Sequence, residues 1–112
     1  MFCIDVYSQY FEGHHVANDI ERHAVVIQLQ ATSEEGVIRY EIGANFFPFT
    51  DREFLITWDD LITEVIYEAP GRRSKKREKA FLEELRPMID KMLESHDAVV
   101  DWDKPLIEAR YG

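Results

Sequence analysis

The chain has 112 residues, which is enough for one compact domain and too few for two cores of ordinary size. A hydrophobic fraction of 46% beside a charged fraction of 31% is typical of a chain that folds, not of a disordered one. The 22 acidic and 13 basic residues give a net charge of -9, which repels phosphate backbones and argues against general binding to nucleic acids or anionic membranes. We therefore expect a single domain over residues 1–112.

The cysteine content and the N-terminal residues indicate a compartment. Cys3 is the single cysteine, so no intramolecular disulfide can form, and the first residues lack the basic and apolar regions of a secretory signal. No apolar run approaches the length of about 20 residues that a membrane-spanning helix needs. We expect a cytoplasmic protein without membrane contact.

The first segment predicts a β-strand. Residues 2–11 alternate loosely and are rich in aromatic and β-branched side chains, which fit a pleated surface. The polar stretch over residues 12–22 has no clean period of 2 or 3.6 and predicts a long irregular connection, where function or mobility tends to lie.

A β-hairpin is predicted next. Residues 24–31 and 37–42 each alternate between apolar and polar side chains. The short polar link over residues 32–36 ends in a glycine, which accepts a positive φ without steric cost. Pro48 cannot donate a hydrogen bond to a sheet, so the third strand should end near Phe47.

An apolar stripe at helical spacing follows the strands, and it predicts a helix over residues 58–68. The stripe consists of Phe54, Leu55, Trp58, Leu61, Ile62, Val65 and Ile66. Asp59 and Asp60 are placed well for a helix N-terminus, and Pro70 with Gly71 should end the helix.

A second helix is predicted after Ser74, a residue type that favours the N-cap position. Its stripe repeats the previous spacing 27 residues later, which two amphipathic helices packed on one sheet explain better than a duplication does. The stripe consists of Phe81, Leu82, Leu85, Met88, Ile89, Met92 and Leu93. Because the stripe stays in phase across Pro87, we expect a kink there and not a break.

The C-terminal part predicts a last short strand over residues 98–102 and a tail over residues 103–112. Together these elements predict an α+β fold. It is a small antiparallel sheet of three to five strands with two C-terminal amphipathic helices packed on one face.

One run of charge departs from the acidic composition. Residues 72–79 hold six bases and one acid, a local charge of +5, which leaves -9 minus +5, or -14, on the rest of the chain. Because cations at a helix N-terminus oppose the helix dipole, this placement suggests a binding role for an anionic ligand, an acidic partner or the acidic flank of a second copy. The alternative is a solvated face that pairs with the acids of the chain itself. The candidate residues are Arg72, Arg73, Lys75, Lys76 and Arg77.

Two further groups of residues are candidates for a site. His14, His15 and His23 are metal-ligand types, but their spacing matches no known signature, and we predict neither a metal site nor a cofactor. Phe46, Phe47 and Phe49 form the densest aromatic cluster, which either fills the core or faces outward as a protein interface.

No convergent catalytic pattern is present. The chain has no phosphate-binding loop and no glycine-rich dinucleotide fingerprint. We therefore expect a non-enzymatic module that acts through contact with another protein or with a second copy of itself. The alternative is a small enzyme or ligand-binding protein that holds a phosphate or carboxylate at the basic helix start, with a loop histidine as general acid or base.

Overall fold

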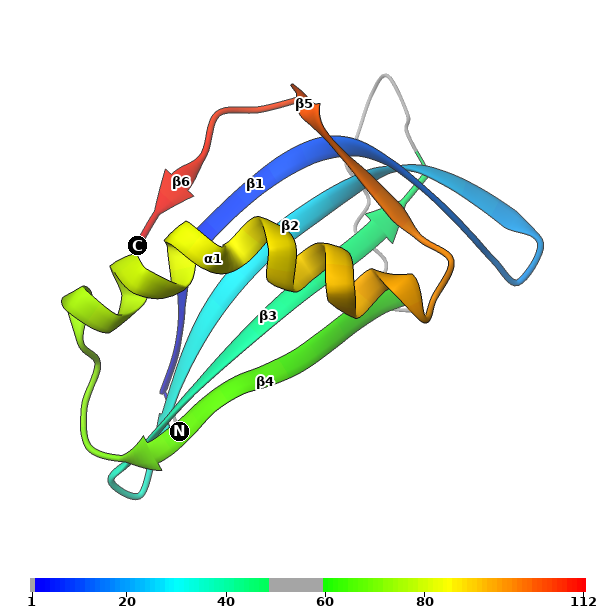
Figure 1. Ribbon diagram of the computed structural model, residues 1–112. Coiled ribbons are helices and arrows are strands. Elements are labelled where there is room, and N and C mark those ends of the chain that lie inside the picture. The colour runs from blue at the N-terminus through cyan, green and yellow to red at the C-terminus, as the bar shows by residue number, and fades with distance from the viewer. Residues whose placement is uncertain (1, 49–59) are drawn as a thin grey trace.

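The computed structural model describes residues 2–48 and 60–112 of the chain. It contains a long antiparallel sheet and one helix, shown in Figure 1. The elements in chain order are β1 (Phe2–Ala17), β2 (Ile20–Glu34), β3 (Val37–Phe47), β4 (Leu61–Pro70), α1 (Lys75–Glu94), β5 (Val99–Pro105) and β6 (Arg110–Tyr111).

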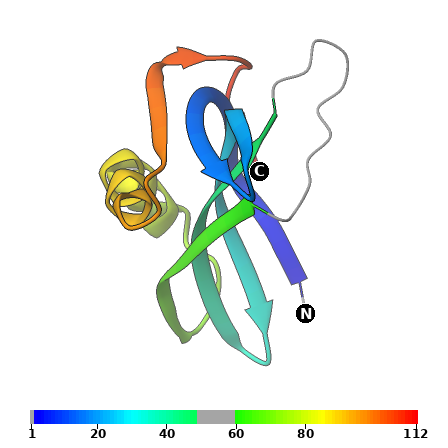
Figure 2. The same ribbon diagram turned by 90° about the vertical axis from the view of Figure 1, so that its right-hand side faces the viewer.

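The sheet is built from neighbouring hairpins. Its strand order is β4-β3-β2-β1-β5, and the short β6 pairs with β1. Every pairing is antiparallel. The helix lies across one face of the sheet, as Figure 2 shows, so the protein has two layers with the core between them.

The predicted hairpin is confirmed. β2 and β3 pair from Ala24 with Phe47 to Glu34 with Val37, and the third strand ends at Phe47 as expected. Glu35 and Gly36 form the turn with positive φ angles of 51° and 78°, the backbone conformation that two-residue hairpin turns favour.

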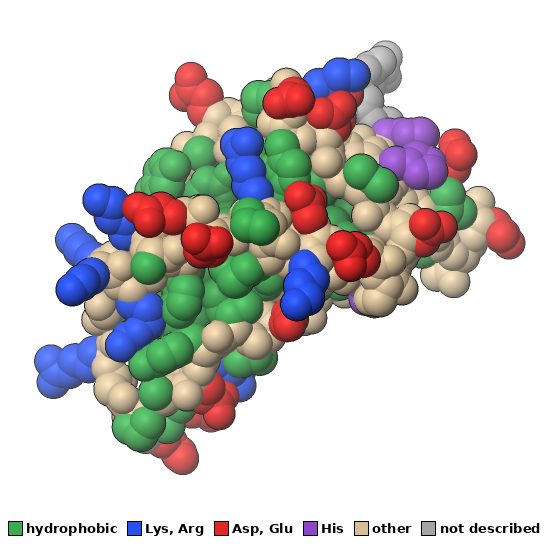
Figure 3. All heavy atoms as spheres, in the orientation of Figure 1, with side chains coloured by type: hydrophobic (Ala, Val, Ile, Leu, Met, Phe, Trp, Pro, Cys, Tyr) green, Lys and Arg blue, Asp and Glu red, His purple; other side chains and the backbone are tan. Residues whose placement is uncertain are grey.

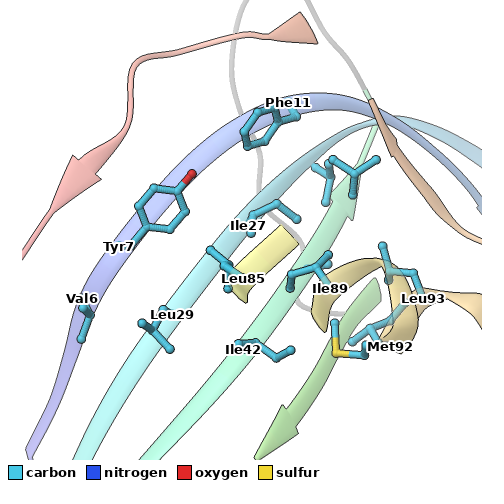
Figure 4. Close-up of a cluster of buried hydrophobic side chains, with 14 of the residues drawn as sticks. Val6, Tyr7, Phe11, Ile27, Leu29, Ile42, Leu85, Ile89, Met92 and Leu93 are labelled. Carbon is cyan, nitrogen blue, oxygen red and sulfur yellow. The ribbon is translucent and has the colours of Figure 1, made fainter. Parts of the chain in front are cut away.

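The core consists of apolar side chains from the helix-facing side of the sheet and from one face of α1. Figure 4 shows them meeting between the two layers. The labelled residues are Val6, Tyr7, Phe11, Ile27, Leu29, Ile42, Leu85, Ile89, Met92 and Leu93. Burial of this stripe is what holds α1 on the sheet, because a helix gains most of its stability from packing its apolar face.

The predicted fold class is wrong in two respects. Within the part of the chain that the structure describes there is one helix and not two, and the sheet has six strands and not three to five. Residues 61–68, assigned to the first helix, lie in the edge strand β4. Ile62 is buried and Val65 is half exposed. The segment is rich in β-branched and aromatic side chains, which lose rotamer freedom in a helix and pack well on a pleated surface. The first residues of the predicted stripe, 54–58, lie outside the described residues.

The connection predicted over residues 12–22 is not irregular either. It forms the end of β1, a tight turn and the start of β2. Asn18 and Asp19 carry the turn with φ angles of 53° and 63°, which these residue types tolerate better than most. The pairing shifts register between Glu12 and His15, and this irregularity disrupts the regular alternation that the sequence pattern would otherwise show.

The second predicted helix is confirmed as α1. The Ser74 side chain accepts a hydrogen bond from the Arg77 backbone N–H at 3.2 Å, which is the expected N-cap geometry. The helix assignment continues through Pro87. At the C-terminus, β5 takes residues 99–105, and Arg110 and Tyr111, in the predicted tail, pair with β1.

Candidate functional site

The start of α1 is fixed by an ion pair between the half-buried Arg73 and the buried Glu78. The Arg73 guanidinium donates two hydrogen bonds to the Glu78 carboxylate, from Nε to Oε2 at 2.9 Å and from Nη2 to Oε1 at 2.7 Å. The Tyr40 hydroxyl donates to Glu78 Oε2 at 2.6 Å and accepts from the Ser74 backbone N–H at 3.3 Å. These bonds tie the first turn of the helix to strand β3.

The charges of this cluster are stabilised by their contacts. The hydrogen bonds from Arg73 lower the pKa of the Glu78 carboxyl against the opposing effect of burial, and the Tyr40 hydroxyl lowers it further. The hydrogen bond with Glu78 raises the pKa of Arg73 in turn. Burial first, and the hydrogen bond to Glu78 second, raise the pKa of the Tyr40 hydroxyl. Glu78 therefore stays ionised and Tyr40 stays neutral near pH 7.

The cations of residues 72–79 divide into two groups. Arg73 pairs with Glu78, and Arg77 packs its guanidinium over the Tyr67 ring at 4.3 Å from the ring centroid, so both are engaged within the chain. The other four are exposed and make no ion pair with the described residues; they are Arg72, Lys75, Lys76 and Lys79. Figure 3 shows Lys and Arg side chains gathered at the end of the molecule where α1 begins.

A shallow pocket lies beside these exposed cations. It has a volume of about 190 Å³, and Val6, Leu82 and Tyr111 supply its apolar lining. Lys75 and Lys79 line it as well. Glu78 also borders the pocket, but its charge is compensated by Arg73. The helix start thus combines free positive charge with a small apolar recess.

A second polar cluster lies at the opposite end of the sheet. His15 Nδ1 is 2.9 Å from Asp60 Oδ2, and Arg22 Nε is 3.3 Å from the same oxygen. All three residues are buried, and Arg22 is only 2% exposed. The sequence analysis missed this cluster. Its one sequence signal is a single arginine in the otherwise acidic stretch before residue 24, and nothing local points to its partner at residue 60.

The three candidate histidines lie at this far end and not at the helix start. His14 and His23 are exposed, with Nε2 atoms 3.8 Å and 3.5 Å from the Glu21 carboxylate, while His15 points to Asp60. Across residues 2–48 and 60–112, no three His, Cys, Asp or Glu side chains are grouped so that they could hold a metal ion.

The aromatic candidates are placed as follows. Phe46 and Phe47 are fully buried. The Phe46 ring lies 5.3 Å from the His15 ring, and the Phe47 ring packs edge-on against Tyr10 at 5.8 Å. Phe49 lies outside the described residues. Phe46 thus belongs to the core between the sheet and the helix, whereas Phe47 is buried outside that core cluster.

An open groove runs between the edge strand β4 and the second half of α1. It has a volume of about 560 Å³. Its apolar lining comes from Ile42, Ile66, Met88 and Met92, and its polar lining from Thr63, Glu64, Lys91, Ser95 and His96. The sequence analysis did not find it because it assigned residues 61–68 to a helix.

Comparison with known proteins does not identify the chain. No family model, no curated protein and no solved structure matches it. No helix within the described ranges is long and apolar enough to cross a bilayer.

Proposed function

We propose that the protein is a non-enzymatic interaction module that binds an acidic protein surface through the exposed cations at the start of α1. The observation that carries the proposal is the division of the cations there. Two of the six are used to fix the helix, and four are left exposed without an ion pair in the described chain.

The exposed cations are not explained by stability. A cation near a helix N-terminus opposes the helix dipole by about 0.3–1 kcal/mol. Arg73 and the Ser74 cap already hold the first turn, and Lys75, Lys76 and Lys79 form no hydrogen bond or ion pair with the described residues. Lys75 acts on the Glu78 carboxylate only through its charge. A binding role accounts for the presence of these lysines at this place.

The kind of partner follows from the remaining charge. The rest of the chain carries -14, which repels long polyanions that would extend beyond the helix start. A protein surface can present a few carboxylates over a small area, so it can contact the cations without approaching the acidic body. A folded acidic partner therefore fits better than a nucleic acid or an anionic bilayer.

The alternative of a small enzyme gains no geometric support. That mechanism needs a histidine close to an anion held at the helix start. His14, His15 and His23 instead lie in or beside the β1–β2 hairpin, at the far end of the molecule from the start of α1 (Figures 1 and 3).

The proposal is tested with a fluorescently labelled Glu-rich peptide. We expect the K75Q/K76Q variant to bind it at least about fivefold more weakly than the wild-type protein, because two exposed charge contacts contribute roughly 1 kcal/mol together. The matched control is K104Q/R110Q, which removes the same charge elsewhere and should bind like the wild-type protein. Added salt should weaken wild-type binding.

Two results would overturn the proposal. Equal binding by both double variants would show that net charge alone matters. A rise in melting temperature with inorganic phosphate that K75Q/K76Q abolishes would favour the small-ligand alternative instead.

A further inference from the structure

The tip of the β1–β2 hairpin, residues 16–21, presents apolar and acidic side chains together. Val16 and Ile20 are 49% and 48% exposed, so both aliphatic side chains are accessible to a partner. Asp19 and Glu21 are exposed beside them. The tip therefore combines two aliphatic side chains with two carboxylates.

The tip is held in one shape from beneath. Arg22 Nη1 donates to the backbone carbonyl oxygens of Ala17 at 2.7 Å and Ile20 at 3.1 Å, on either side of the turn. The same side chain is buried and forms an ion pair with Asp60, just before β4. A hairpin end would ordinarily fray, but this one is fixed, and a fixed loop loses less entropy on binding.

The hairpin tip lies at the opposite end of the molecule from the helix start. The molecule measures 41 Å along its long axis against 27 and 25 Å across. In Figure 1 the hairpin lies at the right-hand end and the start of α1 at the left-hand end. Figure 3 shows the same separation as charge, with Lys and Arg on the left and His with several acidic side chains on the right.

We infer that copies of this chain associate head to tail, with the hairpin tip of one copy bound to the helix start of the next. The inference rests on the proposed function. It identifies the acidic protein surface as the hairpin tip of a second copy of this chain. The two surfaces match in charge, because Asp19, next to Ile20 at the turn, would meet Lys75 and Lys79. Glu21 points to the opposite face of the hairpin from Ile20 and adds to the negative charge of the tip. The two surfaces also match in shape, because the pocket of about 190 Å³ beside these lysines has room for an aliphatic side chain such as that of Ile20.

The geometry determines what kind of assembly forms. The two surfaces differ and lie at opposite ends, so the contact is heterologous unless two copies lie antiparallel and each binds the helix start of the other. Such a heterologous contact produces chains that grow with concentration, or rings if the rotation closes. Since the contact is small and charged, it should be weak and sensitive to salt.

The test is the average mass in solution as a function of protein concentration at low salt, measured by sedimentation equilibrium. We expect the wild-type mass to rise above 13.2 kDa as concentration increases, and to fall back with added salt. The tip variant D19N/E21K keeps a residue that tolerates the positive φ at position 19 and should stay monomeric. The helix-start variant K75E/K79E should also stay monomeric.

Mixing the two variants gives the decisive measurement. The cationic tip of D19N/E21K can bind the acidic helix start of K75E/K79E, and the two unchanged surfaces can bind each other as well. An equimolar mixture should therefore recover a concentration-dependent mass, which also shows that both variants are folded. The control E83K/E84Q makes the same charge change as the tip variant at exposed positions of α1, and it should associate like the wild-type protein.

The contribution of the apolar contact is tested separately. I20S should weaken association at least about threefold, since it removes an aliphatic side chain from the apolar recess. V99S, which alters a 62% exposed valine on β5, should not weaken it.

The inference is overturned if the wild-type protein remains at 13.2 kDa up to about 1 mM, or if the mixture of variants does not associate. The wild-type protein could also stay monomeric and still bind the Glu-rich peptide. That result would support the proposed function and contradict self-association.

Discussion

Arg73 and Glu78 form a two-point ion pair in which Nε and Nη2 of the arginine donate to both carboxylate oxygens, at 2.9 Å and 2.7 Å. The pair joins the residue before the N-cap to the first turn of α1, and Tyr40 ties it to the sheet. This contact removes Arg73 from the positive run as a binding residue. The lysines around it remain free to contact a partner.

Glu78 should make stability depend on acidity. Its folded pKa lies below the usual value of 4.5, because Arg73 and Tyr40 hydrogen-bond the carboxylate. Its stabilisation is therefore complete above the unfolded pKa and is lost as the pH falls through the folded pKa. We expect E78Q to lower the free energy of unfolding by about 2 kcal/mol at pH 7, measured by urea denaturation. The wild-type and E78Q values should converge in acid, and E83Q, at an exposed position of the same helix, should match the wild-type protein throughout.

Asp60 should hold the end of the β1–β2 hairpin. D60N leaves the buried Arg22 without a negative partner, which costs about 3 kcal/mol when one member of a buried pair is removed. Amide hydrogen exchange should accelerate most in residues 15–22, while residues 24–34 of β2 and the whole of β3 remain protected. D103N, at an exposed position, is the control. Uniform acceleration across the sheet would contradict a local role for this contact.

Replacing Gly13 should destabilise the fold because a side chain there has no space, whereas Gly43 has space for a Cβ atom. A Cβ at position 13 would lie 2.8 Å from the Val99 carbonyl oxygen and 3.0 Å from Val25 Cγ1, so β5 or β2 would have to move. We expect G13A to lower the free energy of unfolding by about 1–3 kcal/mol, as overpacked sites do. At position 43 the nearest atom is 3.5 Å away, and G43A should be neutral or slightly stabilising. Thermal or urea unfolding of the two variants measures the difference.

Pro87 should weaken α1. It lies inside the helix, where it removes the hydrogen bond to the carbonyl of Glu83 and crowds that oxygen. Since position 87 is exposed, P87A introduces no new core contact and should raise the free energy of unfolding by at least about 1 kcal/mol. E84A, also at an exposed site of α1, provides the comparison. An unchanged or lower value for P87A would contradict a destabilising role of Pro87 in α1.

The sequence predicts those elements whose signals are local. The β2–β3 hairpin follows from clean alternation around a turn that contains Gly36, and α1 follows from a helical stripe behind a Ser74 cap. Residues 61–68 were misassigned because their apolar spacing also satisfies a helix. Pairing with β3 decides between a helix and a strand, and the sequence pattern of β4 alone does not reveal that partner. The far end of β1 and β2 was missed because a register shift breaks its alternation.

The candidate site divides in the same way. The sequence by itself determined that one positive run lies at the start of the last helix of an acidic chain. Only the tertiary structure decided that Arg73 and Arg77 are engaged while the lysines are free, because that depends on Glu78 and Tyr67 coming within reach. Arg22 and Asp60 are 38 residues apart in the sequence, and only the tertiary structure shows that they form an ion pair. Spacing along the chain fixes which side chains share one element, and burial of the common core fixes which elements meet.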